Sequence, residues 1–340
     1  DRASPAGSTE RRWEVIRTSG STYAPAMVTQ DTAIAEAARR WATEGWVVVD
    51  ELIPQAEIDA AVAELPAGDA EPSTATNPSR HARPRGSGAD DSANANDEPR
   101  FRYRQFSGTV LFPIPDAPHL NRLFVHPRLV AFARAALGDD DLRLYQARLW
   151  SKYAGRVDYA QPHHVDRNHS LVPTRSEPGF WHLECFIYLS DVEADTGAPR
   201  LVPADAVPAY DGSEPIRSQE AAPELYEQEI AAVGRAGSLL AYRSDVWHRG
   251  VDLVRPGSER HVAVAAFRLA ANEWIGYDSF PPLAVNADFA AFVGGSTPDE
   301  LSLFGFPRPG DPYWTPATVE AVAALYPALD RTPWQAALAP

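Results

Sequence analysis

The sequence predicts an α+β fold in which helices buttress an antiparallel sandwich or barrel. Helical patterns come first, a run of strand-like segments follows, and a tail with one further helical pattern comes last. Helices that are grouped apart from a run of strands are typical of α+β folds, whereas α/β folds alternate the two. The 340 residues are enough for one large domain with a sizeable core.

The first half of the chain carries the helical patterns. Residues 29–44 have apolar side chains at helical spacing. The segment WVVVDELI follows and predicts a strand, because β-branched side chains dominate it. Residues 54–65 predict a second helix, and residues 126–137 predict a third that ends at Gly138, a residue suited to a helix C-terminus.

Five later segments predict strands, because they are rich in aliphatic and aromatic residues and are bounded by Gly, Pro, Asp and Asn. They are residues 142–155, 180–192, 197–203, 237–247 and 260–270. A tail rich in proline and aromatic residues follows, with a late helix predicted at residues 317–326.

Three segments differ from a single packed domain over residues 27–340. Residues 1–26 have no apolar stretch of the signal-peptide kind, and we expect a disordered extension there. Residues 66–100 contain no Leu, Ile, Val, Met, Phe, Tyr or Trp, so we expect a flexible insert, either disordered or a lid. Residues 272–340 are expected to form a C-terminal extension that packs on the core.

The composition argues against several classes of protein. Because 31 basic residues stand against 46 acidic ones, the net charge is -15, whereas a nucleic-acid binder carries a basic stripe. No run of about 18 apolar residues exists that could span a bilayer. The single cysteine, Cys185, excludes an intramolecular disulfide and a cysteine-based zinc site. We expect a cytoplasmic protein that acts on a small molecule, without a nucleic-acid or membrane partner.

The segment QPHHVDRN carries the strongest chemical signal. His164 and Asp166 are two residues apart, so on an extended backbone their side chains point to the same face and can bind one metal. His248, in the later segment DVWHRG, can supply a third ligand. Two histidines and one carboxylate form the facial triad that binds iron(II) and leaves three positions open. The alternative for so short a motif is a surface turn.

An arginine further along the chain suits a 2-oxo acid cosubstrate. Arg260 opens the last predicted strand, and a guanidinium group suits bidentate capture of a carboxylate in a buried pocket. Arg255 and Arg268 are alternative anchors, and solvation at the surface is the alternative for all three. We prefer Arg260 because it lies where the strand begins.

The order of these residues resembles the phytanoyl-CoA dioxygenase family. The resemblance rests on His164-x-Asp166, the segment LSDVEADTGAPRLVP, His248 and Arg260, and it extends from residue 33 to residue 271. It implies a double-stranded β-helix, a jelly-roll or cupin-like core, with helices around it. It also implies a non-haem iron(II) oxygenase that uses 2-oxoglutarate and dioxygen.

The resemblance further implies a role for each motif residue. The two histidines and the aspartate would bind iron(II), and Arg260 would bind the distal carboxylate of 2-oxoglutarate. Gln146 matches a glutamine that faces the active site. Lys152 lies near a basic position on the cosubstrate side, and a solvated strand end is its alternative. The carboxylate at Asp166 implies hydroxylation or another oxidation and not halogenation. The family often has a hydroxyl side chain where this chain has Gly250.

Two other functions are compatible with the same residues. A metal-dependent hydrolase or lyase could use zinc on the same three ligands. A non-catalytic β-helix binding protein is also compatible, because a fold does not determine a function. Formation of succinate from 2-oxoglutarate separates the oxygenase from both alternatives.

Overall fold

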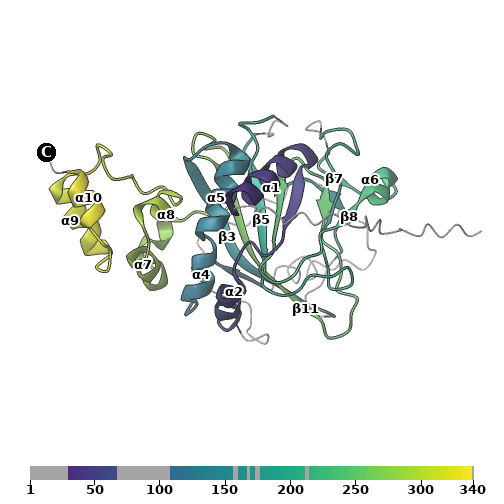
Figure 1. The fold of residues 1–340 in the computed structure, drawn as a ribbon, viewed down its shortest axis with the longest axis horizontal. Coiled ribbons are helices and arrows are strands. Elements are labelled where there is room, and N and C mark those ends of the chain that lie inside the picture. The colour runs from purple at the N-terminus through teal and green to yellow at the C-terminus, as the bar shows by residue number, and fades with distance from the viewer. Residues whose placement is uncertain are drawn as a thin grey trace, which may run out of the picture.

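Two antiparallel sheets lie at the centre of the molecule, and most helices lie along one side of them (Figure 1). The structure is a computed structural model, and it describes residues 30–66, 108–155, 160–166, 169–172, 177–210 and 214–338. The extension expected at residues 1–26 and all but the first residue of the expected insert lie outside the described residues. No described helix has the length and apolar character needed to cross a membrane.

The larger sheet has six strands in the order β1-β9-β5-β11-β3-β2, and all neighbours are antiparallel. They are β1 (Trp46–Val49), β2 (Thr109–Leu111), β3 (Leu142–Tyr153), β5 (Leu183–Tyr188), β9 (Leu239–Arg243) and β11 (Glu259–Leu269). The strands predicted at residues 142–155 and 260–270 are confirmed to within two residues. The strand predicted at residues 180–192 is shorter than expected, because the chain turns away after Tyr188.

The smaller sheet has five strands in the order β7-β4-β10-β6-β8, and its neighbours are also antiparallel. They are β4 (His163–His164), β6 (Arg200–Leu201), β7 (Ile216–Arg217), β8 (Ile230–Ala231) and β10 (His248–Arg249). Each strand has only two residues, so no alternating pattern can show in the sequence. For this reason the sequence predicted a strand only at β6.

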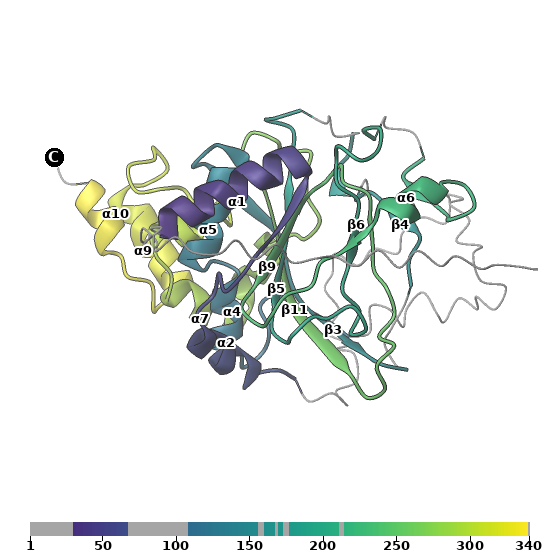
Figure 2. The ribbon, with the colours of Figure 1, turned by 45° about the vertical axis from the view of Figure 1, so that its right-hand side comes forward.

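The two sheets face each other across a buried interior (Figure 2). From β3 to β6, and again from β9 to β11, consecutive strands belong to different sheets, so the chain crosses between the sheets at each connection. Phe186, Leu240 and Val264 of the larger sheet pack in one cluster with Leu201 of the smaller sheet. Alternate residues of the central strands therefore point into the space between the sheets.

The other face of the larger sheet packs on helices. Ile187 and Ala265 point to this side and share a core cluster with Trp41 and Leu129 of the helices. The helices are α1 (Gln30–Glu44), α2 (Gln55–Val62), α4 (Pro118–Leu123) and α5 (Pro127–Leu137). Gly138 caps α5 with a φ of 73°, a left-handed conformation that glycine adopts without strain, and this confirms the predicted helix end.

The residues after β11 add short helices on the same side (Figure 1). They are η2 (Pro281–Val285), α7 (Ala287–Gly294), α8 (Pro298–Ser302), α9 (Pro316–Leu325) and α10 (Thr332–Ala337), and α6 (Pro223–Gln228) lies beside the smaller sheet. The sequence predicted only α9, shifted by one residue. Phe112, which follows β2, joins these helices to the core, because its ring lies 5.0 Å from Phe292 and 5.4 Å from Phe304.

Candidate active site

Strands β4 and β10 of the smaller sheet bring the predicted metal ligands together. His164 pairs with His248 directly across the two strands, and the centroids of their rings are 4.3 Å apart. Asp166 Oδ2 lies 3.4 Å from His248 Nε2, and Asp166 Oδ1 lies 3.9 Å from His164 Nε2. One atom from each side chain lies within 4.8 Å of the other two. These three residues are called the triad below.

Backbone carbonyls orient both imidazoles of the triad. His164 Nδ1 donates to the carbonyl of Pro162 at 3.0 Å, and His248 Nδ1 donates to the carbonyl of Val246 at 2.9 Å. With Nδ1 protonated, each ring keeps a lone pair on Nε2, the atom that faces the carboxylate of Asp166. The triad therefore presents two neutral nitrogens and one carboxylate, which is the donor set that iron(II) takes in facial-triad enzymes.

The electrostatics of the triad favour this protonation state. Burial lowers the pKa of His164 to about 4, and the neighbouring His248 lowers it further than burial alone. Burial by itself raises the pKa of Asp166, but His248 and His169 lower it, and the pKa of this carboxyl is held below its usual range. The hydroxyl of Tyr242 donates to Asp166 Oδ2 at 3.1 Å. Protons therefore compete weakly with a metal at neutral pH.

A second feature of the interior is a pair of buried cations. Arg260 on β11 lies opposite Lys152 on β3, and their side chains are 1% and 2% exposed. Arg260 donates from Nη1 to the carbonyl of Gly197, and it forms no ion pair with a described residue. Its Nε has no hydrogen-bond partner within the described chain, and burial lowers its pKa to about 10.

The cation pair lies beside the strand that carries His248. Lys152 Nζ donates to the carbonyl of Val251 at 3.3 Å. A β-carbon at Gly250 would lie 3.4 Å from Lys152 Nζ and 2.7 Å from Oε1 of Gln161, so the Gln161 amide takes the space where the family often has a hydroxyl. An anionic group that reached Arg260 would neutralise its buried positive charge.

The two alternative anchors lie elsewhere. Arg255 is exposed, and its Nη2 lies 2.8 Å from Oδ1 of Asp195. Arg268 lies near the other end of β11 and donates to the carbonyls of Leu269 and Ala270. Of the three arginines, Arg260 is therefore the one that is buried beside the triad strands.

The structure separates Gln146 from the cation pair. Gln146 lies six residues before Lys152 on β3, which corresponds to about 20 Å along an extended strand. With its amide oriented to satisfy both neighbours, Gln146 donates to Glu184 Oε2 and accepts from Arg148 Nη2, each at 3.1 Å. Gln146 is buried beside these polar residues, and its place in the active site stays a prediction.

That polar set is a second histidine–carboxylate cluster, which the sequence analysis did not identify. Glu184 Oε1 accepts from Tyr145 at 2.5 Å and from His169 Nδ1 at 2.9 Å, and His182 Nδ1 lies 2.5 Å from the tyrosine oxygen. All four side chains are buried. His182 and Glu184 are spaced like His164 and Asp166, and that spacing in a predicted strand was the available signal.

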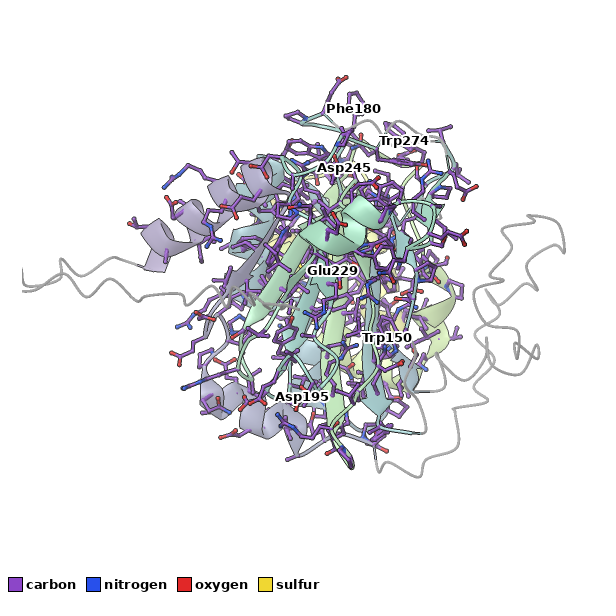
Figure 3. All side chains as sticks on the ribbon, turned by 90° about the vertical axis from the view of Figure 1, so that its right-hand side faces the viewer. Trp150, Phe180, Asp195, Glu229, Asp245 and Trp274 are labelled. Atoms are coloured by element: carbon purple, nitrogen blue, oxygen red, sulfur yellow. The ribbon has the colours of Figure 1, made fainter. Side chains whose placement is uncertain are left out.

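The sequence analysis also did not identify Glu229, whose carboxylate links β4 and β10, the two strands that carry the triad histidines. His163 on β4 donates from Nε2 to Glu229 Oε2 at 2.8 Å. Arg249 on β10 donates to both oxygens of the same carboxylate, at 2.6 Å and 2.8 Å. His163 and Arg249 are the immediate neighbours of the two triad histidines. Figure 3 views the side of the molecule that carries α6 and labels Glu229 near its middle.

A model of one protein family matches most of the sequence. The phytanoyl-CoA dioxygenase (PhyH) model matches residues 41–252, a range that contains the whole triad and Lys152 but not Arg260. The chain belongs to the phytanoyl-CoA dioxygenase family. This membership makes iron(II) the metal that the protein uses, with 2-oxoglutarate and dioxygen as cosubstrates, and the triad is a group of residues that could hold the metal. No curated protein matches the sequence.

The chain is also similar to solved structures at low sequence identity. The epimerase SnoN, in complex with Fe3+, alpha ketoglutarate and nogalamycin RO, is 20% identical, with a TM-score of 0.49 over 70% of this chain and 84% of that chain. EctD from S. alaskensis in its apoform is 17% identical, with a TM-score of 0.47 over 78% of this chain and 85% of that chain. Apo HygX from Streptomyces hygroscopicus is 14% identical, with a TM-score of 0.44 over 69% and 86%.

Proposed function

We propose that this protein is an iron(II)/2-oxoglutarate-dependent dioxygenase that hydroxylates a small organic substrate and releases succinate and carbon dioxide. One observation carries the proposal: the triad and the buried Arg260, which has no ion-pair partner among the described residues, lie in the same interior. A metal site alone is compatible with hydrolysis. A buried guanidinium beside it gives the far carboxylate of a 2-oxo acid its counter-ion.

The strand order supports a double-stranded β-helix. The larger sheet contains β3, β5, β9 and β11, and the smaller sheet contains β4, β6, β8 and β10. Eight strands divided in this way between two facing antiparallel sheets correspond to a jelly roll. The fold then positions the triad on the smaller sheet and Arg260 on the larger sheet, so the cosubstrate spans the interior.

Each residue of the site has a separate role in this proposal. His164, Asp166 and His248 would hold the iron. Arg260 and Lys152 would bind and orient 2-oxoglutarate, and their burial excludes water from its far carboxylate. When bound, iron supplies the redox chemistry that couples decarboxylation of the cosubstrate by dioxygen to oxidation of the substrate.

The polar cluster around Glu184 suits the substrate side of the interior. It lies beside the triad, because the backbone N–H of His169 donates to the carbonyl of Asp166 at 3.2 Å. It also lies near Gln146, far along β3 from the cation pair. A substrate between the triad and this cluster would meet hydroxyl, imidazole and amide groups, so we propose a polar small molecule.

Succinate formation tests the function. Purified protein with iron(II), ascorbate and 2-oxoglutarate is expected to form succinate slowly in air, because these enzymes turn over their cosubstrate even without the substrate. The reaction should stop when zinc replaces iron or when oxygen is removed. Succinate formation that survives either change would contradict the proposal, and a protein that binds iron but forms no succinate with any small molecule would favour the binding protein.

A further inference from the structure

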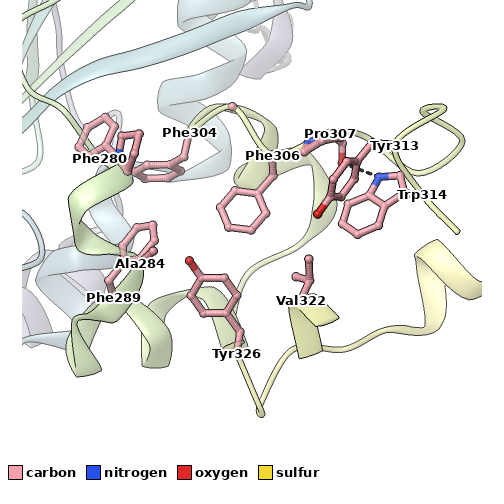
Figure 4. Close-up of a pocket in the computed structure, with 12 residues that line it drawn as sticks. Phe280, Ala284, Phe289, Phe304, Phe306, Pro307, Tyr313, Trp314, Val322 and Tyr326 are labelled. Carbon is pink, nitrogen blue, oxygen red and sulfur yellow. Dashed lines mark hydrogen bonds between the residues drawn. The ribbon is translucent and has the colours of Figure 1, made fainter. Parts of the chain in front are cut away.

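A cavity of about 320 Å³ lies among the C-terminal helices, apart from the triad (Figure 4). It is lined by η2, α7, α9 and the segment between α8 and α9, with Phe280, Phe304, Phe306, Trp314 and Tyr326 among its walls. Its aromatic residues belong to the core cluster on the helix side of the larger sheet, whereas the triad lies on the other side. The walls also lie beyond residues 41–252, the part that the family model matches.

The walls of the cavity are uncharged. None of the twelve residues that line it is acidic, basic or histidine. A charged ligand would lose its hydration there without gaining a partner, so the occupant must be neutral. The wall rings already meet edge to face, with Phe280 and Phe304 at 5.0 Å and 70°. An aromatic occupant could extend this arrangement, which is the preferred geometry of ring pairs.

Tyr326 provides an unused polar group inside the cavity. Its side chain is 4% exposed, and its hydroxyl forms no hydrogen bond with any described residue. Figure 4 shows the hydroxyl pointing into the cavity, on the side where Ala284 and Phe289 lie. Trp314 is different, because its Nε1 already donates to the carbonyls of Pro307 and Arg308. Solvent reaches the hydroxyl through the cavity, so a ligand with a matching polar atom can replace water as its hydrogen-bond partner.

The volume limits the size of the occupant. An apolar cavity of about 150 Å³ holds one benzene ring, so a volume of about 320 Å³ suits two fused rings. We propose that this cavity binds an uncharged two-ring aromatic molecule that carries one hydroxyl or carbonyl group, which pairs with Tyr326. The proposal does not depend on the catalytic function.

Two probes that differ by one hydroxyl test the role of Tyr326. Titration calorimetry should show that 2-naphthol and naphthalene each bind the full chain with one saturable site. Tyr326→Phe should weaken the affinity for 2-naphthol by roughly fivefold, which is the effect of one neutral hydrogen bond. The affinity for naphthalene should stay unchanged. Tyr277→Phe is the matched control, because Tyr277 is 42% exposed and does not line the cavity, and it should change neither affinity. Equal affinities of 2-naphthol for wild type and Tyr326→Phe would overturn the assigned pairing.

A cavity-filling variant tests the place of binding. Ala284→Phe should abolish binding of both probes while circular dichroism and the unfolding temperature stay near wild type, and Val322→Phe serves if that variant does not fold. Probes that bind the filled variant as tightly as wild type, or no binding to wild type, would overturn the proposal. Because η2 and α9 also expose Val285 and Leu325, a second copy is the other occupant. A wild-type dimer in sedimentation that Ala284→Phe dissociates would likewise overturn it.

Discussion

The interior contains two clusters of the same composition that differ in how their histidines are hydrogen-bonded. Each consists of two histidines and one carboxylate with ligand atoms within 4.8 Å of one another. In the triad, Nδ1 of each histidine donates to a backbone carbonyl, so Nε2 is left with a lone pair. In the cluster around Glu184, the Nδ1 atoms bond instead to the carboxylate and to a tyrosine hydroxyl.

The hydroxyl of Tyr145 is the main structural difference between the two clusters. The hydroxyl of Tyr145 lies 2.5 Å from Glu184 Oε1, 2.5 Å from His182 Nδ1 and 3.4 Å from His169 Nδ1, so it already fills the space between the three side chains. A metal ion in that space would have to displace it. The two clusters have the same residue types. We therefore expect the backbone carbonyls that orient the imidazoles to distinguish a metal site from a hydrogen-bond network.

The largest effect is expected from removing one carboxylate from each cluster. Asp166→Ala should abolish iron-dependent succinate formation, because two imidazoles alone do not hold iron(II) in a facial site. Glu184→Ala should keep one bound iron per chain and instead lower the free energy of unfolding by about 3 kcal/mol, because it leaves buried histidines without their anion.

Metal analysis after anaerobic dialysis and denaturant unfolding measure the two outcomes. The matched control is Glu193→Ala, which removes an exposed carboxylate that bonds Arg255 and should change neither quantity. A loss of iron in Glu184→Ala that equals the loss in Asp166→Ala would mean that the second cluster also holds metal, and the comparison would be wrong.

The sequence predicted the triad because its spacing is local. His164 and Asp166 show the two-residue period of a strand, and His248 and Arg260 stand in recognisable segments. The pairing of Arg260 with Lys152 depends on the register of β11 against β3, which no local pattern encodes. The long strands were predictable for the same reason that the two-residue strands were not: a period needs several residues to show.

The sequence shows the spacing of His182 and Glu184 but not the whole second cluster, because the cluster joins strands that are not neighbours. Tyr145 lies on β3 and Glu184 on β5, and β11 runs between these strands in the sheet. Glu229 lies just after α6 and bonds to residues of β4 and β10, two strands that the sequence did not predict. Only the three-dimensional fold brings such side chains together, whereas the helix stop at Gly138 could be read from one residue.

The second prediction sharpens the comparison at the cation pair beside the triad. At about 100 times its dissociation constant, 2-oxoglutarate should stabilise the manganese-loaded protein by about 2.7 kcal/mol, a rise of about 4 °C in the unfolding temperature. Arg260→Ala should keep the rise caused by manganese and lose the further rise, because the distal carboxylate loses its guanidinium partner. Arg255→Ala, which removes an exposed ion pair, should behave like wild type. The opposite result for these two variants would place the anchor at Arg255.

The third prediction uses the opposite pKa shifts of one histidine from each cluster, His164 and His169, in metal-free protein. The pKa of His164 is lowered to about 4 by burial and His248. Below about pH 6.5 this histidine therefore binds a proton in the unfolded chain but not in the folded chain. The free energy of unfolding falls as the pH falls from about 6.5 to 4. Burial lowers the pKa of His169, but Glu184 and Asp166 raise it more, and the net direction is upward. Its contribution is complete below about pH 6.5 and is lost as the pH rises through its folded pKa.

Substitution by glutamine separates the two histidines. As the pH falls from 6.5 to 4.5 in denaturant unfolding, the free energy of unfolding of His164→Gln should rise by about 2 kcal/mol relative to that of wild type. The reason is that only wild type has a buried titrating imidazole at position 164. His169→Gln should be less stable than wild type at pH 6, and the gap should narrow toward pH 9. Carboxylates apart from Asp166 and Glu184, whose pKa values these histidines help to lower, titrate alike in all three proteins and cancel. Parallel stability curves for the two variants would show that His164 and His169 do not differ in protonation.

The smallest effect is expected at Glu229, which acts on the triad through the strands. Its carboxylate joins His163 and Arg249, the neighbours of the two triad histidines, so it fixes the spacing of β4 and β10. Glu229→Gln keeps the shape but loses the charge, and about a tenfold weaker affinity for iron(II) is expected, as for other groups that orient metal ligands. The 2-oxoglutarate affinity at saturating metal should stay near wild type, since Arg260 and Lys152 are untouched. A general loss of stability would weaken both affinities together, whereas a positioning role weakens only the metal, and the ratio of the two measured constants decides between them.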